Sequence, residues 1–209
     1  MRCPIERRGR PRPPMKYQSI VFISSAGLLG FVYLILTVYS VAAASANGHI
    51  DPKRTQITFD VDSIGLGVTH GTFRSFNGQL DVDLKKPQRS SVEFFVDASS
   101  VDTGSGQLDN YIRSAFFDTA NFPAMKFRSS YVRKIDDQAA EVGGDLDLHG
   151  IVRPVVLKVF VNRALGDQRR LTFVAMTTIR RSEFGMTAAT PIVADEIAIR
   201  VSTEAYDPE

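Results

Sequence analysis

The sequence predicts an all-β fold in which about eight antiparallel strands form a barrel or a two-sheet sandwich. Most segments after residue 55 alternate apolar and polar residues with a period of two, which is typical of strands with one buried face. The connections between these segments mostly have hairpin length, which favours antiparallel pairing over helical crossovers. One stretch has helical spacing, and it adds a single helical excursion to the sheet.

Residues 1–46 precede this pattern and are expected to be an export signal. A basic stretch, Arg7–Lys16, leads into the run Ile20–Ala46, which contains no Asp, Glu, Lys or Arg and ends in Ala44-Ser45-Ala46. A basic start, an apolar core and small residues of this type favour signal cleavage. The run is longer than the usual core of about 7–15 residues, so an uncleaved membrane anchor remains the alternative.

Either form would export the rest of the chain, because the basic side stays cytoplasmic. Cleavage would leave a periplasmic or otherwise extracytoplasmic protein, and an anchor would tether it to the inner membrane. Residues 47–54 are expected to be a short linker, and residues 55–206 form the predicted β domain. Met1 and Met15 are both candidate start residues.

Charge and cysteine content exclude several classes of function. The chain has 25 basic and 23 acidic residues, of which six and one lie in residues 1–46, leaving 19 and 22. This mildly acidic remainder argues against nucleic-acid binding. The single cysteine, Cys3, precedes the apolar run, so the exported part has no disulfide, thiolate metal site or cysteine nucleophile.

The expected strands follow from alternation and from the turns that interrupt it. Phe76 to Leu84 alternate apolar and polar residues until Lys86-Pro87-Gln88, and Met125 to Ile135 do so until Asp136-Asp137-Gln138. The nine expected strand segments are 55–61, 68–73, 76–84, 92–98, 125–135, 142–149, 154–164, 169–180 and 193–204, close to the estimate of about eight strands.

The one expected helix is Gln107–Phe117. Leu108, Tyr111, Ile112 and Ala115 recur at helical spacing there, directly after the turn-like residues 102–106.

Five ordered motifs resemble those of the YceI-like family of exported lipid-binding proteins. They are Gly71–Gly78, Asp97–Gly104, Leu108–Asp118 with Asn121-Phe122-Pro123, Gly144–Val155 and Ile179–Gly185. The resemblance covers nearly all of residues 50–204. It implies an elongated, lipocalin-like barrel of eight antiparallel strands whose interior holds a long isoprenoid or acyl chain.

Alternation alone cannot separate a filled barrel core from a ligand cavity. The resemblance favours the cavity, and the inward faces of the expected strands then supply its wall. The candidate wall residues are Phe76, Leu80, Val82, Val92, Phe94, Val96, Phe127, Tyr131, Leu146, Leu148, Val155, Leu157, Val159, Phe173, Ile197 and Ile199.

A second set of residues is expected at the rim of the cavity. Tyr111, Ile112, Phe116, Phe117, Phe122 and Phe184 either fix the helix over one barrel end or border the ligand entrance. Arg181 and Arg113 are candidates for contacting a polar headgroup, since guanidinium groups bind phosphate and other oxygens. The alternative for both arginines is local pairing on the surface.

The expected protein has no catalytic residue, no metal and no cofactor. Its expected partners are a long apolar lipid, with an isoprenoid or quinone-like molecule as the ligand, and a membrane that supplies it. The three histidines, His49, His70 and His149, fit no metal-binding motif, and the last two are expected in turns. The oligomeric state is left open, with a homodimer as one alternative.

Two rival functions remain from the sequence. One is a lipid-headgroup hydrolase or isomerase that uses His70 or His149 as a base. The other is a filled barrel that acts as an extracytoplasmic adaptor or stress protein.

Overall fold

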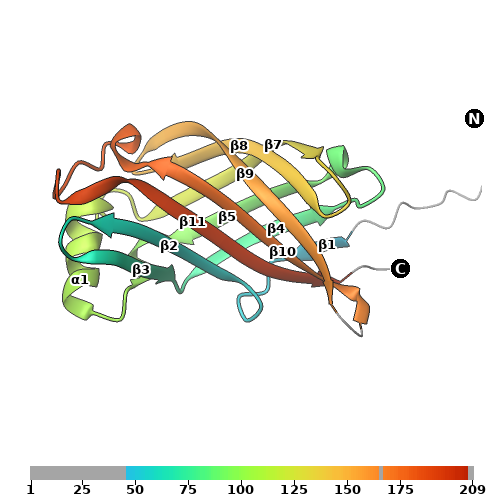
Figure 1. Cartoon of the computed structure of the whole chain (residues 1–209), viewed down its shortest axis with the longest axis horizontal. Helices are drawn as coiled ribbons and strands as arrows, with labels where there is room; N and C mark the ends of the chain where they lie inside the picture. Colours follow the sequence, from blue (N-terminus) through green and yellow to red (C-terminus); the bar gives the residue numbers. More distant parts are fainter. Residues whose placement is uncertain (1–45, 165–166, 207–209) are drawn as a thin grey trace, which may run out of the picture. The chain divides into compact units, whose positions relative to one another are not determined.

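The computed structural model describes residues 46–164 and 167–206, which fold into one antiparallel sheet that curls into a barrel (Figure 1). The strand order is β1-β4-β5-β7-β8-β9-β10-β11-β2-β3-β6. Every strand pair in this part of the chain is antiparallel. The predicted all-β antiparallel barrel with one short helix is therefore confirmed.

Each expected strand segment contains a strand. The strands are β1 (Ala46–His49), β2 (Gln56–Ser63), β3 (Gly67–Phe73), β4 (Phe76–Val82), β5 (Ser91–Asp97), β6 (Val101–Asp102), β7 (Ala124–Lys134), β8 (Ala139–Leu148), β9 (Ile151–Ala164), β10 (Asp167–Arg180) and β11 (Val193–Tyr206). The sheet thus has eleven strands and not about eight. Two short strands, β1 and β6, were not expected, because four and two residues are too few to show alternation.

Strand β1 lies partly in the segment expected to be a linker. Ala46 to His49 pair with β4, and Ile50 continues the contact by donating its N–H to Gly78 O at 3.0 Å. Ile50 is also buried, at 7% exposure. The barrel therefore begins before residue 55. The rest of the expected export segment, residues 1–45, lies outside the described residues.

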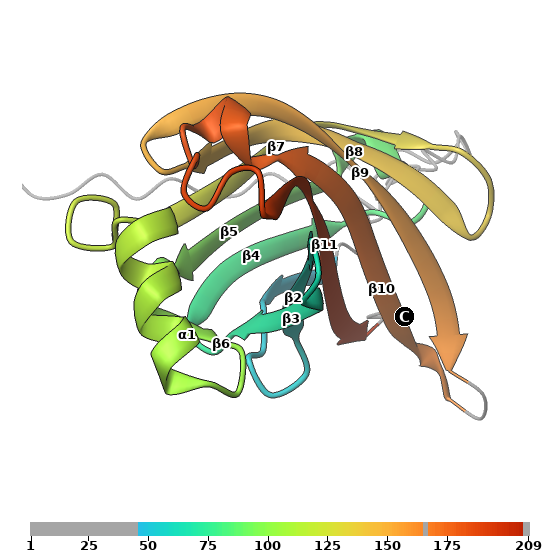
Figure 2. The same ribbon diagram turned by 60° about the vertical axis from the view of Figure 1, so that its left-hand side comes forward.

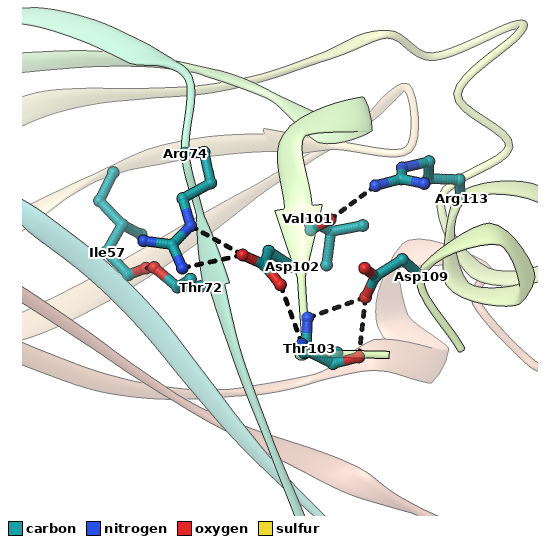
Figure 3. Close-up of polar contacts among 9 residues, drawn as sticks. Ile57, Thr72, Arg74, Val101, Asp102, Thr103, Asp109 and Arg113 are labelled. Carbon is teal, nitrogen blue, oxygen red and sulfur yellow. Dashed lines mark hydrogen bonds and ion pairs between the residues drawn. The ribbon is translucent and has the colours of Figure 1, made fainter. Parts of the chain in front are cut away.

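The expected helix is present as α1 (Gly106–Tyr111) and a π-helical turn, η3 (Ile112–Phe116), in which Phe117 N–H donates to Ile112 O. Ser105 caps the helix, since its side chain accepts from Leu108 N–H. Asp109 accepts from the backbone N–H and the hydroxyl of Thr103, at 2.8 and 2.7 Å (Figure 3). These contacts join the start of the helix to the end of β6.

The two ends of the barrel carry different elements (Figures 1 and 2). One end, called the helix end below, carries α1, the β2–β3 turn and the connection from η4 (Arg181–Phe184) to β11. The other, called the hairpin end, carries the β7–β8 turn and η1 (Pro87–Arg89). No helix among the described residues is long and apolar enough to cross a membrane.

Buried apolar side chains form three clusters in the described part of the chain and not one continuous core. Ile57, Phe59, Phe73, Val101 and Ile112 form the first, and partly buried side chains of α1 and η3 pack on it. Leu148, Ile179, Phe184 and Met186 form the second, and Val82, Leu171 and Phe173 form the third. Much of the barrel interior is left to a cavity.

Candidate functional site

The candidate site is a cavity of about 1150 Å³ inside the barrel. Small-molecule pockets are commonly about 300–1,000 Å³, so this space suits a larger ligand. Inward side chains of β2 to β5 and β7 to β11 form the wall, and α1 and η3 close part of the helix end. Most of these side chains are aliphatic or aromatic.

The structure places fourteen of the sixteen expected wall residues on this cavity. They are Leu80, Val82, Val92, Phe94, Val96, Phe127, Leu146, Leu148, Val155, Leu157, Val159, Phe173, Ile197 and Ile199. Their position follows from alternation, because residues two apart in a strand share a face. Ligand contact at these residues remains a prediction.

Tyr131 does not lie on the cavity wall, and a β-bulge explains why. Ser129 pairs with Gly144 and Tyr131 with Gly143, so Ser130 is an extra residue in β7. The extra residue reverses the inward and outward faces after it, and Val132 and Lys134 reach the cavity instead. Tyr131 lies on the outer surface, where its hydroxyl donates to Glu141 Oε1 at 3.0 Å.

Phe76 also lies off the cavity wall. It is the first residue of β4 and pairs with Val96. Its side chain packs against the buried cluster around Phe73 and Ile112. Phe76 therefore belongs to the packed core beside the helix.

Several wall residues were not expected from the sequence. Ile57, Phe59 and Val61 line the cavity from β2, and Val142, Leu171, Ile179 and Val201 line it from other strands. The alternation of Ile57, Phe59 and Val61 with polar neighbours was the signal that could have identified β2 as a wall strand.

The expected rim residues separate into two groups. Tyr111, Ile112, Phe116 and Phe117 line the cavity from the helix end. Phe122 and Phe184 do not. Phe122 packs on the His149 ring, with 4.5 Å between ring centroids, and Phe184 is 1% exposed within the second buried cluster. These two aromatic rings hold the β8–β9 turn and η4 in place.

Arg113 does not face the cavity. It donates to Ser99 O at 2.6 Å and to Asn110 Oδ1 at 2.9 Å. It also donates to Val101 O at 2.8 Å, as Figure 3 shows. These bonds attach the helix to the segment before β6. The expected headgroup contact of Arg113 is corrected to this anchoring position, because Arg113 lies off the cavity wall and three of its five N–H groups already donate to protein oxygens.

Arg181 lines the cavity at the helix end and is buried, at 2% exposure. All five of its N–H donors are used: Nε donates to Ala194 O, Nη1 to Met186 O and Ala188 O, and Nη2 to Thr190 Oγ1 and Val193 O, at 2.6–3.2 Å. The Phe116 ring covers its guanidinium at 5.4 Å. No donor is therefore left for the bidentate headgroup contact expected from the sequence.

Asp195 supports the same connection from outside the cavity. Its carboxylate accepts from the hydroxyl and the backbone N–H of Ser182, both at 2.8 Å. These two hydrogen bonds lower the pKa of Asp195, and the positive charges of Arg181 and Arg180 act in the same direction. Asp195 thus stays ionised and holds η4 against β11.

The hairpin end of the cavity is polar, and charged groups there have hydrogen-bond partners in the protein. Lys134 Nζ lies 2.6 Å from Asp137 Oδ1, a hydrogen bond that lowers the pKa of Asp137. Asp83, which is 6% exposed, accepts from the backbone N–H groups of Lys85 and Lys86. The middle of the cavity is left to apolar side chains.

A model of the YceI-like domain matches residues 49–205, three quarters of the chain. The chain belongs to the YceI-like family. Among its YceI-like relatives is Protein YceI of Salmonella agona, 30% identical over 184 residues that cover 85% of this chain and 95% of that protein. A UPF0312 protein of Pseudomonas savastanoi pv. phaseolicola is 30% identical over 159 residues, 73% of this chain and 83% of that protein.

Solved structures share the YceI-like fold. BcnA of Burkholderia cenocepacia superposes with a TM-score of 0.69 at 25% identity and covers 75% of this chain and 99% of its own. A polyisoprenoid binding domain from Saccharophagus degradans, implicated in plant cell wall breakdown, gives a TM-score of 0.60 at 14% identity, with 79% and 99% covered. The second likeness concerns the fold alone.

Neither His70 nor His149 faces the cavity of this YceI-like barrel. His70 lies in β3 and not in a turn, and its Nδ1 is 2.6 Å from Asp60 Oδ1 at an exposed position. His149 does lie in a turn, with a φ of 54°, and its Nδ1 is 3.1 Å from Phe184 O. Within the ranges that the structure describes, no three His, Cys, Asp or Glu residues are grouped to bind a metal.

Proposed function

We propose that this YceI-like protein is an exported, non-enzymatic carrier that holds a long isoprenoid, quinone or fatty-acyl lipid inside its barrel. The observation that carries the proposal is the cavity of about 1150 Å³ with its apolar wall. A filled-barrel adaptor would need side chains in this space. The polyisoprenoid binding domain that shares the fold supports the ligand class.

Apolar contact is sufficient to hold such a ligand. A lipid tail that buries about 600 Å² of apolar surface gains up to about 15 kcal/mol, at about 25 cal/mol per Å². The loss of ligand freedom removes much of this gain, but useful affinity remains. Binding therefore requires no bond-making group in the wall.

The place of action depends on residues 1–46. If the segment is cleaved, the protein diffuses outside the cytoplasm and extracts its ligand from a membrane; if it stays, the barrel is tethered beside its lipid source. We favour cleavage, because Ala44-Ser45-Ala46 supplies the small residues that a signal peptidase needs. Transport, storage and protection against stress are all compatible with this type of carrier.

Mass spectrometry of the protein, purified after its native host has processed it, tests both the lipid binding and the signal cleavage. The protein is purified without detergent, and native spectra are expected to show an adduct with the mass of a prenyl or acyl lipid. Denaturing spectra are expected to give a chain that begins at Ser45 or Asn47. The carrier proposal fails if there is no adduct and added polyprenol, quinone and fatty acid all fail to bind, and an intact Met1 or Met15 overturns cleavage.

A further inference from the structure

The loops at the two ends of the barrel differ in charge. At the helix end, residues 63–69 around the β2–β3 turn and the segment 186–193 contain no Asp, Glu, Lys or Arg. At the hairpin end, the connection 83–90 contains Asp83, Lys85, Lys86 and Arg89, and the β7–β8 turn contains two aspartates. The two loops at the helix end are therefore uncharged, whereas the loops at the hairpin end carry charges.

The helix end also exposes large apolar side chains. The exposed fraction is 82% for Leu66, 74% for Ile64, 52% for Val68, 52% for Ile192 and 47% for Tyr111. These five residues are called the apolar rim. Single exposed apolar side chains are ordinary, but a group of them at one end of a barrel marks an interaction surface.

The two loops of the apolar rim are joined to each other, and the rim borders the cavity. The N–H of Ile64 donates to Ile192 O at 2.8 Å, which joins the two loops. Leu66, Ile192 and Tyr111 are exposed and also line the cavity. A lipid that passes between these three side chains would move from the outside into the barrel without leaving apolar surface.

We propose that the apolar rim docks on the surface of a lipid bilayer, so that ligand enters and leaves the cavity at the helix end. Charged side chains are costly in the apolar part of a bilayer, and the two rim loops have none. Such loops fit an interfacial anchor that buries apolar side chains at the boundary between headgroups and acyl chains. The exchange route rests on the proposed function, whereas the docking itself does not.

A second protein fits this surface less well than a bilayer. Stable protein interfaces use about 20–30 residues on each side. The two rim loops and Tyr111 supply fewer than that, with residues 63–69, 186–193 and 111. Charged side chains, which contribute to the polar outer part of a protein interface, are missing from both loops.

A single tryptophan can test the docking, because the chain contains none. We suggest Ile64→Trp in the full-length chain, since Ile64 is exposed and does not line the cavity. Its fluorescence is measured with phosphatidylcholine vesicles and with the same vesicles made from brominated lipid. We expect the emission to shift to shorter wavelength and to be quenched by the brominated lipid. The probe reports only its own surroundings, so membrane contact of residues 1–46 alone leaves it unquenched.

The matched control is Val156→Trp, at a 48% exposed position of β9 on the outer wall. We expect no shift and no quenching there. Adding Ile192→Asp to the Ile64→Trp chain should raise the vesicle concentration needed for half-maximal quenching at least about tenfold, because a charge enters the interface. Ile135→Asp, at the exposed β7–β8 turn, should leave it unchanged.

An unquenched Ile64→Trp probe, or equal quenching of Val156→Trp, overturns the docking proposal. Titration of the Ile64→Trp protein with polyprenol separates the two proposals. Polyprenol binding without quenching means that the barrel holds lipid and the rim does not dock. Quenching without polyprenol, quinone or fatty-acid binding means that the rim docks and the proposed function is wrong.

Discussion

Arg181 carries a full positive charge into the barrel wall, where an uncompensated ion would be costly. Four backbone carbonyls and one hydroxyl accept its five N–H groups, and no carboxylate in the described part of the chain lies within salt-bridge distance. All of these acceptors lie in residues 186–194, which lead into β11. Arg181 therefore fixes the connection that carries one half of the apolar rim.

We expect Arg181→Met to lower the free energy of unfolding by about 3 kcal/mol or more, because buried carbonyls lose their donors. Urea unfolding measures this loss. The control is Arg180→Met, since Arg180 is the exposed neighbour and its replacement should cost less than about 0.5 kcal/mol. Equal losses in the two variants would mean that the hydrogen bonds of Arg181 contribute no special stability.

Strands β2 and β3 show how a single glycine shapes the cavity. Gly71 pairs with Phe59, and a Cβ added at Gly71 would overlap the Phe59 ring. The missing side chain lets the ring lie across β3. Phe59 then lines the cavity and packs on Phe73 with 5.5 Å between ring centroids.

Gly71→Ala is expected to push the Phe59 ring out of this position and to cost about 1–3 kcal/mol of stability, as overpacking usually does. A double-mutant cycle with Phe59→Leu tests the cause by urea unfolding. In the Phe59→Leu background the added methyl group has room, so its cost should fall below about 1 kcal/mol. The explanation is wrong if Gly71→Ala costs the same in both backgrounds.

Strand β7 marks the limit of what alternation can predict. Phe127 faces the cavity as expected, but the bulge at Ser130 turns Tyr131 outward and brings Val132 inward. A bulge adds one residue and leaves almost no mark on a sequence that is polar on both sides of it. By contrast, β5 and β9 contain no shift in register between their wall residues, and all their expected wall residues lie on the cavity.

The sequence predicts the fold of the whole barrel more completely than it predicts the interior of the barrel. Hairpin-length connections predicted the antiparallel pairing of the strands. The short strands β1 and β6 were the elements that the sequence did not predict. The donors of Arg113 and Arg181 could not be assigned, because their carbonyl partners depend on how the connections fold. The residues alone also did not decide whether the barrel has a cavity, since the same aliphatic side chains can fill a barrel or line it.

The central claim is that the apolar middle of the barrel holds the lipid, and two alanines on neighbouring strands allow a direct test. Ala175 of β10 faces the cavity, whereas Ala198 of β11 is exposed and not among the wall residues. Ala175→Trp fills part of the cavity, and Ala198→Trp adds the same group outside it. Circular dichroism checks that both proteins keep the fold. If Ala175→Trp does not keep it, Ala175→Phe is used in its place.

The decisive measurement is the dissociation constant for polyprenol, quinone or fatty acid, whichever the wild-type protein binds, in each variant. We predict that Ala175→Trp weakens binding at least about tenfold, which corresponds to about 1.4 kcal/mol, and that Ala198→Trp leaves it within about twofold. A folded Ala175→Trp protein that binds the ligand as tightly as the wild type would contradict a binding site in the middle of the barrel.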